Sequence, residues 1–365
     1  MTLTRGDQTK KLTSQEIARQ TGVSRTTVSY VLSGREGVRV STETRERILQ
    51  VARQAGYRRN HLAQALISGR MYSVGIVTHA DSLRDPENTY IQQLFIQLTL
   101  AIRAVKMNAM TFFDPFVGEE SDEEGLRPSD LTDGRIDGVI LVGHIPAPGW
   151  VDAVIRQNGI AYVTINTCPN DASIFADNIG GTRMAVEHLL TLGHQRIAYF
   201  THPASTSIAK RERLDSFQET LMGAGIAEED APVVDSEQAL TELLQRGAKR
   251  PTAIMTFNDE LASVALRVFR HEGFDVPQDI SLIGFDDDVR AKAMVPPLTT
   301  VAMPIQEMAQ AAVAELLHQI EGEATSSSDR LPLSADSIHS RQPKIIPARL
   351  AVRESTAPPP LLSRI

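Results

Sequence analysis

Apolar residues recur at helical spacing in three short stretches at the start of the chain. The stretches run from Thr13 to Gly22, from Ser24 to about Ser33 and from Ser41 to Gly56. The first opens with the Thr-x-x-Glu spacing of a capping box, and each of the three is followed by glycine. Two short helices joined by a tight glycine turn, with a third that completes the core, predict a helix-turn-helix domain.

From Ser73 onward, short apolar runs alternate with longer amphipathic stretches. The runs that predict strands are 74–78, 109–113, 138–142, 161–165, 196–200, 253–257 and 281–285. The stretches that predict helices are 91–105, 182–191, 214–222 and 259–270. This alternation predicts parallel sheets with helices on both faces. With 365 residues, the chain is long enough for two or three domains with their own cores.

Charge separates the same two parts of the chain. The first seventy residues hold thirteen Lys and Arg against five Asp and Glu, a difference of about +8, while the whole chain carries −8. A basic module on an acidic protein is typical of a domain that binds a polyanion, so we expect DNA binding to be confined to the head.

The second predicted helix is the candidate reading helix. In a helix-turn-helix, the N-terminal residues of this helix face base edges in the major groove. We expect Arg25, Thr26 and Tyr30 to contact bases, and Thr27, Ser29 and Arg35 to contact phosphates. The alternative is a small helical domain whose surface arginines are only solvated.

A short segment, 58–71, follows the head and predicts a hinge. Leu62, Ala63, Leu66 and Ile67 form a narrow apolar stripe at helical spacing, but the segment is too short for a stable helix alone in water. A second copy or DNA would have to stabilise it. Leu66 could then act as a wedge in the minor groove. The alternative is a linker helix that packs on the body.

Several motifs in this order resemble the LacI/GalR family of bacterial transcriptional regulators. In the head and hinge they are Ile17-Ala18, Gly22-Val23-Ser24, Thr27-Val28-Ser29, Val31-Leu32, Thr44-Arg45, Ala55-Gly56-Tyr57 and Asn60 through Ala63 to Leu66. In the body they are 187–190, 193–198, Asn258-Asp259, 283–287, 296–301 and 351–356. The resemblance covers about residues 12–357. It implies a two-lobed periplasmic-binding-protein-like body and DNA contacts from Asn60, His61, Ala63 and Leu66, with Leu66 at the family's minor-groove leucine.

Four residues at three places depart from the family pattern. Arg59 stands where the family usually has proline, at the start of the hinge helix. Tyr30 stands where arginine is common, which predicts unusual outer bases in the operator. Gly180 and Gly181 stand where the family has a pocket aspartate, which argues against a simple galactoside as the ligand.

The predicted organisation is a small all-α helix-turn-helix head and an α/β two-lobed body. The head is 1–57 and the hinge 58–71; the N-terminal effector-binding lobe is 72–193 with 301–325, the C-terminal lobe 194–300 with 326–357, and the tail 358–365. The chain would cross between lobes near Gly193, near Thr300 and within 325–345. We have no function for the long 325–345 loop.

Ligands in open α/β folds bind outside the carboxyl ends of the strands, which predicts the effector site. The polar residues just after predicted strands are His79, Asp81, Asn166, Asn258, Asp259 and Asp286. Arg213 opens a helix after a strand and a loop, and the resemblance aligns Arg213, Asn258 and Asp286 with effector contacts. Carboxylate, amide and guanidinium groups suit the paired hydroxyls of a sugar. Asp259 could instead cap its own helix.

The sequence lacks the motifs of the enzyme classes considered. It has no Walker loop, nucleophile elbow or His-Glu-x-x-His, so we expect no catalytic residues, metal or cofactor. A single cysteine, Cys168, and a start without an apolar signal core predict a bacterial cytoplasmic protein without membrane contact.

The favoured function is a ligand-responsive repressor that binds a palindromic operator in double-stranded DNA as a homodimer. Its effector is expected to be a carbohydrate. A regulator that needs a nucleobase-type corepressor is the alternative. A free-standing sugar-binding protein is disfavoured because the head is present and a signal peptide is not.

Overall fold

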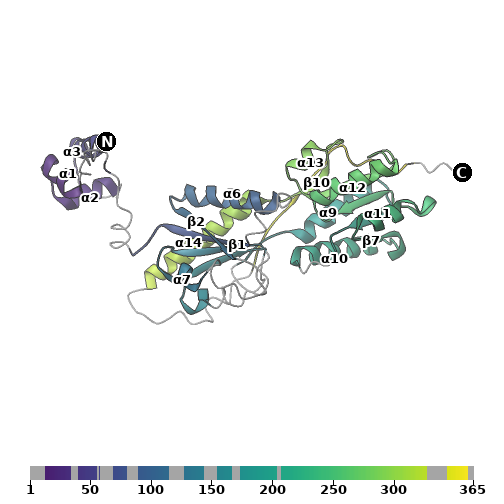
Figure 1. The fold of residues 1–365 in the computed structure, drawn as a ribbon, viewed down its shortest axis with the longest axis horizontal. Helices are drawn as coiled ribbons and strands as arrows, with labels where there is room; N and C mark the ends of the chain where they lie inside the picture. Colours follow the sequence, from purple (N-terminus) through teal and green to yellow (C-terminus); the bar gives the residue numbers. More distant parts are fainter. Residues whose placement is uncertain are drawn as a thin grey trace, which may run out of the picture. The chain divides into compact units, whose positions relative to one another are not determined.

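The structure is a computed structural model that divides into two compact units, Met1–Met71 and Tyr72–Ile365. It describes residues 13–33, 40–55, 57, 69–79, 89–114, 127–143, 154–166, 173–203, 207–326 and 343–360. Figure 1 labels the main elements of both units. Each unit is described by itself below.

The head is the three-helix domain that its periodicity predicts. Its helices are α1 (Ser14–Thr21), α2 (Arg25–Ser33) and α3 (Thr42–Gln54). The Thr13 hydroxyl accepts the Glu16 amide at the start of α1, and Gly22 ends that helix at φ +69°, in the left-handed region. Ile17, Val28 and Ile48, one from each helix, are fully buried and form the centre of the head's core.

The first sheet of the body has six strands in the order β11-β5-β4-β3-β1-β2. Their bounds are β1 (Ser73–His79), β2 (Asn108–Asp114), β3 (Gly138–Val142), β4 (Ala161–Ile165), β5 (Ser173–Ala176) and β11 (Lys344–Ile346). Every neighbouring pair is parallel. Strands β3 and β4 are buried along their whole length, as expected for the centre of a sheet covered on both faces.

The second sheet also has six strands, in the order β12-β10-β9-β8-β6-β7. Their bounds are β6 (Ile197–Phe200), β7 (Val233–Val234), β8 (Ala253–Thr256), β9 (Ser281–Asp286), β10 (Thr299–Ala302) and β12 (Arg349–Ala351). Only the edge pair β10–β12 is antiparallel among the pairs of this sheet in the described chain. We call the elements on the first sheet the first lobe and those on the second sheet the second lobe.

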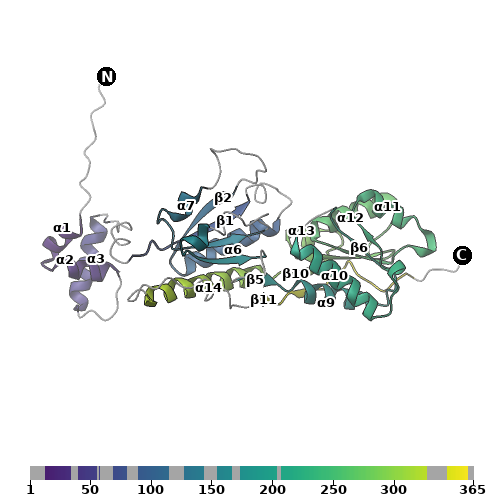
Figure 2. The same cartoon turned by 90° about the horizontal axis from the view of Figure 1, so that it is seen from below.

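Helices cover both faces of each sheet, as Figures 1 and 2 show. The first lobe has α6 (Thr89–Ala104), α7 (Pro128–Thr132) and α14 (Ile305–Ser326). The second lobe has α9 (Asn178–Thr191), α10 (Ile208–Gly223), α11 (Glu237–Leu244), α12 (Asp259–Glu272) and α13 (Val289–Ala293), with the 3₁₀ turns Glu228–Asp230 and Gly247–Lys249. The predicted two-lobed α/β body is therefore confirmed. Within the described residues, no helix combines the length and apolar character that crossing a membrane requires.

The chain passes between the two sheets at three places. The first crossing lies at Asp177, between β5 and α9, because α9 packs on α10 and on the second sheet. Gly181 explains the fit: a side chain there would collide with Val301 and Phe285. The sequence placed this crossing too late, near Gly193, and so gave α9 to the wrong lobe.

The other two crossings lie close to their predicted places. The second follows β10, before α14 joins the first sheet, and the third falls at 347–348, between β11 and β12. Strand β11 therefore belongs to the first sheet, whereas the sequence assigned residues 326–357 to the C-terminal lobe. Most of the 325–345 loop lies outside the described residues.

Candidate functional site

Helix α2 has a polar outer face because Val28 and Val31 direct its opposite face into the head's core. Val28 is 0 % exposed and Val31 4 %. The predicted base-contacting residues Arg25 and Thr26 and the predicted phosphate contact Ser29 are all exposed. This face offers a guanidinium and two hydroxyls to solvent, the groups that form hydrogen bonds with base edges and phosphates.

Two other predicted contacts on α2 are partly buried. The Thr27 backbone N–H donates to the Ser24 hydroxyl at 3.0 Å, and the two side-chain oxygens lie 2.8 Å apart. Ser24 therefore caps α2, and the Thr27 hydroxyl already takes part in this cap. Tyr30 is partly exposed. The remaining predicted DNA contacts, Arg35, Asn60, His61, Ala63 and Leu66, lie outside the described residues.

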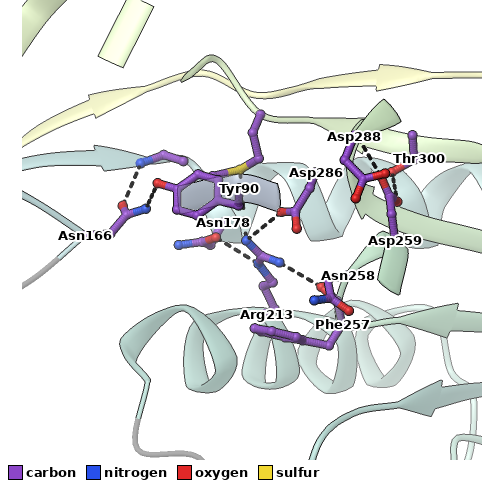
Figure 3. Close-up of polar contacts among 12 residues, drawn as sticks. Tyr90, Asn166, Asn178, Arg213, Phe257, Asn258, Asp259, Asp286, Asp288 and Thr300 are labelled. Atoms are coloured by element: carbon purple, nitrogen blue, oxygen red, sulfur yellow. Dashed lines mark hydrogen bonds and ion pairs between the residues drawn. The ribbon is translucent and has the colours of Figure 1, made fainter. Parts of the chain in front are cut away.

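Arg213, on α10, is the centre of the polar residues of the body (Figure 3). It is only 4 % exposed. Its Nε donates to Asn178 Oδ1 at 2.9 Å and its Nη1 to the Phe257 carbonyl at 2.7 Å. Nη2 lies 3.6 Å from Asp286 Oδ1 and 3.9 Å from Met303 Sδ. Every guanidinium nitrogen thus has a partner, as a buried charge requires.

Two aromatic rings also contact this guanidinium. Its central carbon lies 3.5 Å from the centroid of Phe285 and 4.8 Å from that of Phe257. The His202 ring packs edge-on against Phe257, at 5.7 Å between centroids. Burial lowers the pKa of His202, and Lys210 adds to this effect. Arg213 is therefore held by stacking as well as by hydrogen bonds.

Asp286 ends β9 with an unusual backbone conformation. Its φ is +112° and that of Asp287 is +55°, two consecutive left-handed residues that are not glycine. Such strain is commonly found at functional sites. Burial raises the pKa of Asp286 to about 7, although the Arg213 guanidinium acts in the opposite direction by favouring the carboxylate. Its charge state therefore changes near neutral pH.

Tyr90 and Asn166, both from the first lobe, lie beside Arg213 and Asp286. Asn166 follows β4 at φ +54° and donates its Nδ2 to the Tyr90 hydroxyl, while its Oδ1 accepts the Ala176 amide at 3.4 Å. Burial raises the pKa of Tyr90, and the Asp286 charge adds to the shift. Asn166 thus orients the tyrosine. We call Tyr90, Asn166, Asn178, Arg213 and Asp286 the central polar cluster (Figure 3).

Asn258 and Asp259 follow β8 but differ in what they contact. Asn258 caps α12, since its Oδ1 accepts the Leu261 amide at 3.0 Å. Asp259 is 0 % exposed; it accepts the Thr300 hydroxyl at 2.6 Å and the Asp288 amide at 2.9 Å. Burial raises the pKa of Asp259 well above its ordinary value.

Both Asp259 oxygens are therefore used inside the second lobe. Gly284, on the adjacent strand, lies against one of them with no room for a Cβ. The sequence placed Asp259 among the effector contacts, but in the structure it supports the turn after β9. His79 ends β1, whereas its side chain and the whole of Asp81 lie outside what the structure describes.

Three members of this site were missed from the sequence. Tyr90 precedes the predicted helix 91–105, Phe257 ends the predicted strand 253–257, and Asn178 precedes the predicted helix 182–191; none of the three was among the candidate site residues. Asn178 is 2 % exposed and bridges Arg213 to Glu212, to which its Nδ2 donates at 2.8 Å. Asn178 is the first residue of α9 and lies two positions after β5, a strand that the sequence did not predict, so no local signal marked it.

The cluster consists of hydrogen-bonding groups. Among the described residues, no group of three or more His, Cys, Asp and Glu side chains is placed to hold a metal ion. The cluster offers a carboxylate, amides, a phenol and a guanidinium from both lobes. These groups form hydrogen bonds with a polar ligand, and aromatic rings stack on apolar faces of a ligand.

Known protein families match both parts of the chain. The description "Bacterial regulatory proteins, lacI family" matches residues 13–60, and "Periplasmic binding protein-like domain" matches residues 186–356. The HTH-type transcriptional regulator DegA of Bacillus subtilis (strain 168) is 30 % identical over 361 residues, which cover 95 % of this chain and 99 % of DegA.

Solved structures give the same result. A lac repressor dimer bound to operator and the anti-inducer ONPF has a TM-score of 0.73 and 25 % identity, covering 95 % of this chain and 100 % of that one. A complex of the transcriptional regulator CelR with cellobiose has a TM-score of 0.62 and 27 % identity, covering 94 % and 99 %.

A helix-turn-helix head on a two-lobed body with a polar binding cluster defines an effector-binding transcriptional regulator. The chain belongs to the LacI family of DNA-binding transcriptional regulators and repressors. Its relatives are regulators and not enzymes, in agreement with the expectation drawn from the sequence.

Proposed function

We propose that the protein is a homodimeric repressor that binds a palindromic operator and responds to a sugar or sugar derivative held at the central polar cluster. The observation that carries the proposal is the Arg213–Asp286 pair, which lies at the carboxyl end of β9 and has Tyr90 of the other lobe beside it. A ligand there would contact both lobes at once. Its binding would therefore favour one arrangement of the lobes over another.

The head would read each half-site through α2. Arg25 is exposed and suits a bidentate contact to guanine, worth about 1–3 kcal/mol of discrimination. Thr26 suits a thymine methyl or a base acceptor. Thr27, Ser29 and Arg35 would contact phosphates, and Tyr30 would change the preference at the outer bases. These contacts require the major groove and a partner head one helical turn away.

The hinge would form only on the operator. Two copies of 58–71 would pair there, with Asn60, His61 and Ala63 near the minor groove and Leu66 wedged between base steps. A two-fold dimer matches a palindromic site, because each half-site then meets the same surface. The lac repressor dimer on its operator supports this assignment.

The groups in and beside the central polar cluster support a sugar as the effector. Asp286 accepts paired hydroxyls when ionised, Asn258 has an amide nitrogen to donate, and Phe257 gives an apolar ring for a sugar face. The complex of CelR with cellobiose supports a sugar. His79 and Asp81 at the end of β1 are further proposed contacts.

The first experiment is selection of genomic DNA fragments by the purified dimer, followed by sequencing. We expect one palindromic motif, and genes beside the bound sites that indicate the effector. The selection is repeated with cellobiose, with ribose and with hypoxanthine as probes. Release or gain of the motif with a sugar supports the proposal. A response to hypoxanthine alone would replace the sugar with a nucleobase, and sequence-independent binding under every condition would refute it.

A further inference from the structure

A hydrogen bond joins the two lobes next to the central polar cluster. Thr89, the first residue of α6 in the first lobe, donates its hydroxyl to Asp288 Oδ2 of the second lobe at 2.6 Å. Asp288 is 2 % exposed and Thr89 is partly buried. A hydrogen bond to a carboxylate that is shielded from water is among the stronger kinds in proteins.

Arg290 completes this contact from the second lobe. Its Nε and Nη2 lie 2.7 and 2.6 Å from the same Asp288 oxygen, and Nη2 also donates to the Thr89 hydroxyl oxygen at 3.2 Å. The other Asp288 oxygen accepts the Arg290 and Ala291 amides and caps α13. Asp288 is therefore fixed by its own lobe and can accept the Thr89 hydroxyl without reorganising.

The Thr89–Asp288 contact is connected to Asp286, the proposed ligand-binding carboxylate, through one short turn. Asp286 and Asp288 are separated only by Asp287, and both Asp286 and Asp287 have left-handed backbones. The Asp288 amide donates to the buried Asp259, and Asp287 accepts Arg353 Nη2 at 2.6 Å. A turn held at each residue leaves little room for Asp286 to shift without moving Asp288.

In the first lobe, too, the residue of the interlobe contact lies next to a residue of the central polar cluster. Thr89 precedes Tyr90, whose hydroxyl accepts Asn166 in the central polar cluster (Figure 3). One turn of α6 thus carries both a proposed ligand contact and the bond to the second lobe. A ligand that draws Tyr90 and Asp286 together would also favour the Thr89–Asp288 bond.

We infer that Thr89, Asp288 and Arg290 form an interlobe latch that stabilises the arrangement of the lobes in this structure and so sets the strength of the effector response. The inference rests on the proposed function, because it takes the central polar cluster as the effector site. The latch acts through position and makes no contact with the ligand itself. Its loss therefore weakens effector binding and leaves every group of the cluster in place.

The test uses the full-length dimer and the variant Thr89→Val, which removes the hydroxyl and keeps the shape. Thr89→Ser restores the hydroxyl. Thr99→Val is the matched control on the same helix, because the Thr99 hydroxyl donates to the Phe95 carbonyl within α6. Spin labels at the exposed positions Arg103 and Glu219, in a Cys168→Ser background, report the distance between lobes. Labelled chains are diluted in unlabelled chain, so that each pair reports one protomer.

We expect the interlobe distance of Thr89→Val to spread to longer values, while wild type, Thr89→Ser and Thr99→Val keep one distribution. Affinity for cellobiose or ribose, whichever binds, should fall about tenfold in Thr89→Val alone, as for loss of a hydrogen bond to a charged group. A distance distribution and a sugar affinity equal to those of Thr99→Val would overturn the latch. Where neither sugar binds, the distance alone decides, and a failed operator selection refutes the proposed function separately.

Discussion

Helix α2 and the central polar cluster both depend on an arginine, but the two arginines lie in opposite environments. Arg25 is exposed on α2, whereas Arg213 is buried with a partner at every nitrogen. A side chain that reads DNA has to exchange water for a base edge, so it stays solvated until the operator arrives. A buried guanidinium has to be positioned by its own lobe, and the hydrogen bonds and aromatic rings around Arg213 compensate its charge. The same residue type thus stands exposed on the proposed DNA-reading helix and buried as a structural centre in the body.

The largest test of this contrast is Arg213→Met. Removing the guanidinium leaves Asn178 Oδ1, the Phe257 carbonyl and Asp286 without their partner. We expect the free energy of unfolding to fall by about 3–5 kcal/mol, as for one partner of a buried ion pair. Urea unfolding of the full chain measures it. Arg103→Met, at an exposed position on α6, is the control and should change stability by less than about 0.5 kcal/mol. If Arg213→Met lowered the free energy of unfolding as little as Arg103→Met, the structural role of Arg213 would be contradicted.

The second test is Arg25→Ala, which should leave folding unchanged and alter DNA recognition. We expect a loss of about 1–3 kcal/mol in operator binding, confined to one base pair of each half-site. Binding to a library of operators with single substitutions measures this loss. Arg53→Ala on α3 is the control, since the Arg53 Nε bonds to the Leu49 carbonyl of its own helix. An equal loss on every sequence would show that Arg25 contacts only phosphate.

The contrast also explains what the sequence could and could not predict. Helical spacing and glycine stops located α1 and α2 correctly, because these signals are local. They also placed Arg25 on the outer face. The partners of Arg213 come from α9, from the end of β9 and from the residues just after β8 and β10, and no local pattern specifies which of these meet.

Asp259 shows the same limit in the opposite direction. It follows a strand, as a ligand residue should, yet the absence of a side chain at Gly284 lets it lie buried against β9 and bond to Thr300. Strands β5, β7, β10 and β11, of two to four residues each, are absent from the strands predicted from the sequence. Such short strands are defined by their neighbours in the sheet and not by their own periodicity.

The third test uses pH. Because the pKa of Asp286 is raised to about 7, the carboxylate is lost as pH falls from 8 to 6. A neutral carboxyl group accepts hydroxyl hydrogen bonds less well, so effector affinity should fall with decreasing pH, by up to about tenfold per unit below the pKa. Titration with the responding sugar at several pH values measures this slope. Asp286→Asn should bind more weakly at pH 8 and lose the slope, while its operator binding persists. A slope that survives in Asp286→Asn would assign the titration to another group.

The smallest expected effect concerns a buried polar residue far from the ligand. His194 is 1 % exposed; its Nδ1 lies 2.8 Å from the Thr252 hydroxyl and its Nε2 2.9 Å from the Ala357 carbonyl. Burial lowers the pKa of His194, so the unfolded chain binds a proton there more readily than the folded protein. The stability it contributes is fully present above the ordinary histidine pKa of about 6.5 and is lost as pH falls from there through the lower pKa of the folded protein. We expect the free energy of unfolding to decrease as the pH is lowered from 7 to 5. His194→Gln should reduce this dependence, whereas His318→Gln, at an exposed position on α14, should retain it. If both variants keep the full pH dependence, other groups cause the acid sensitivity. Burial of a polar side chain with fixed partners, as at Arg213, would then not by itself indicate a contribution to stability.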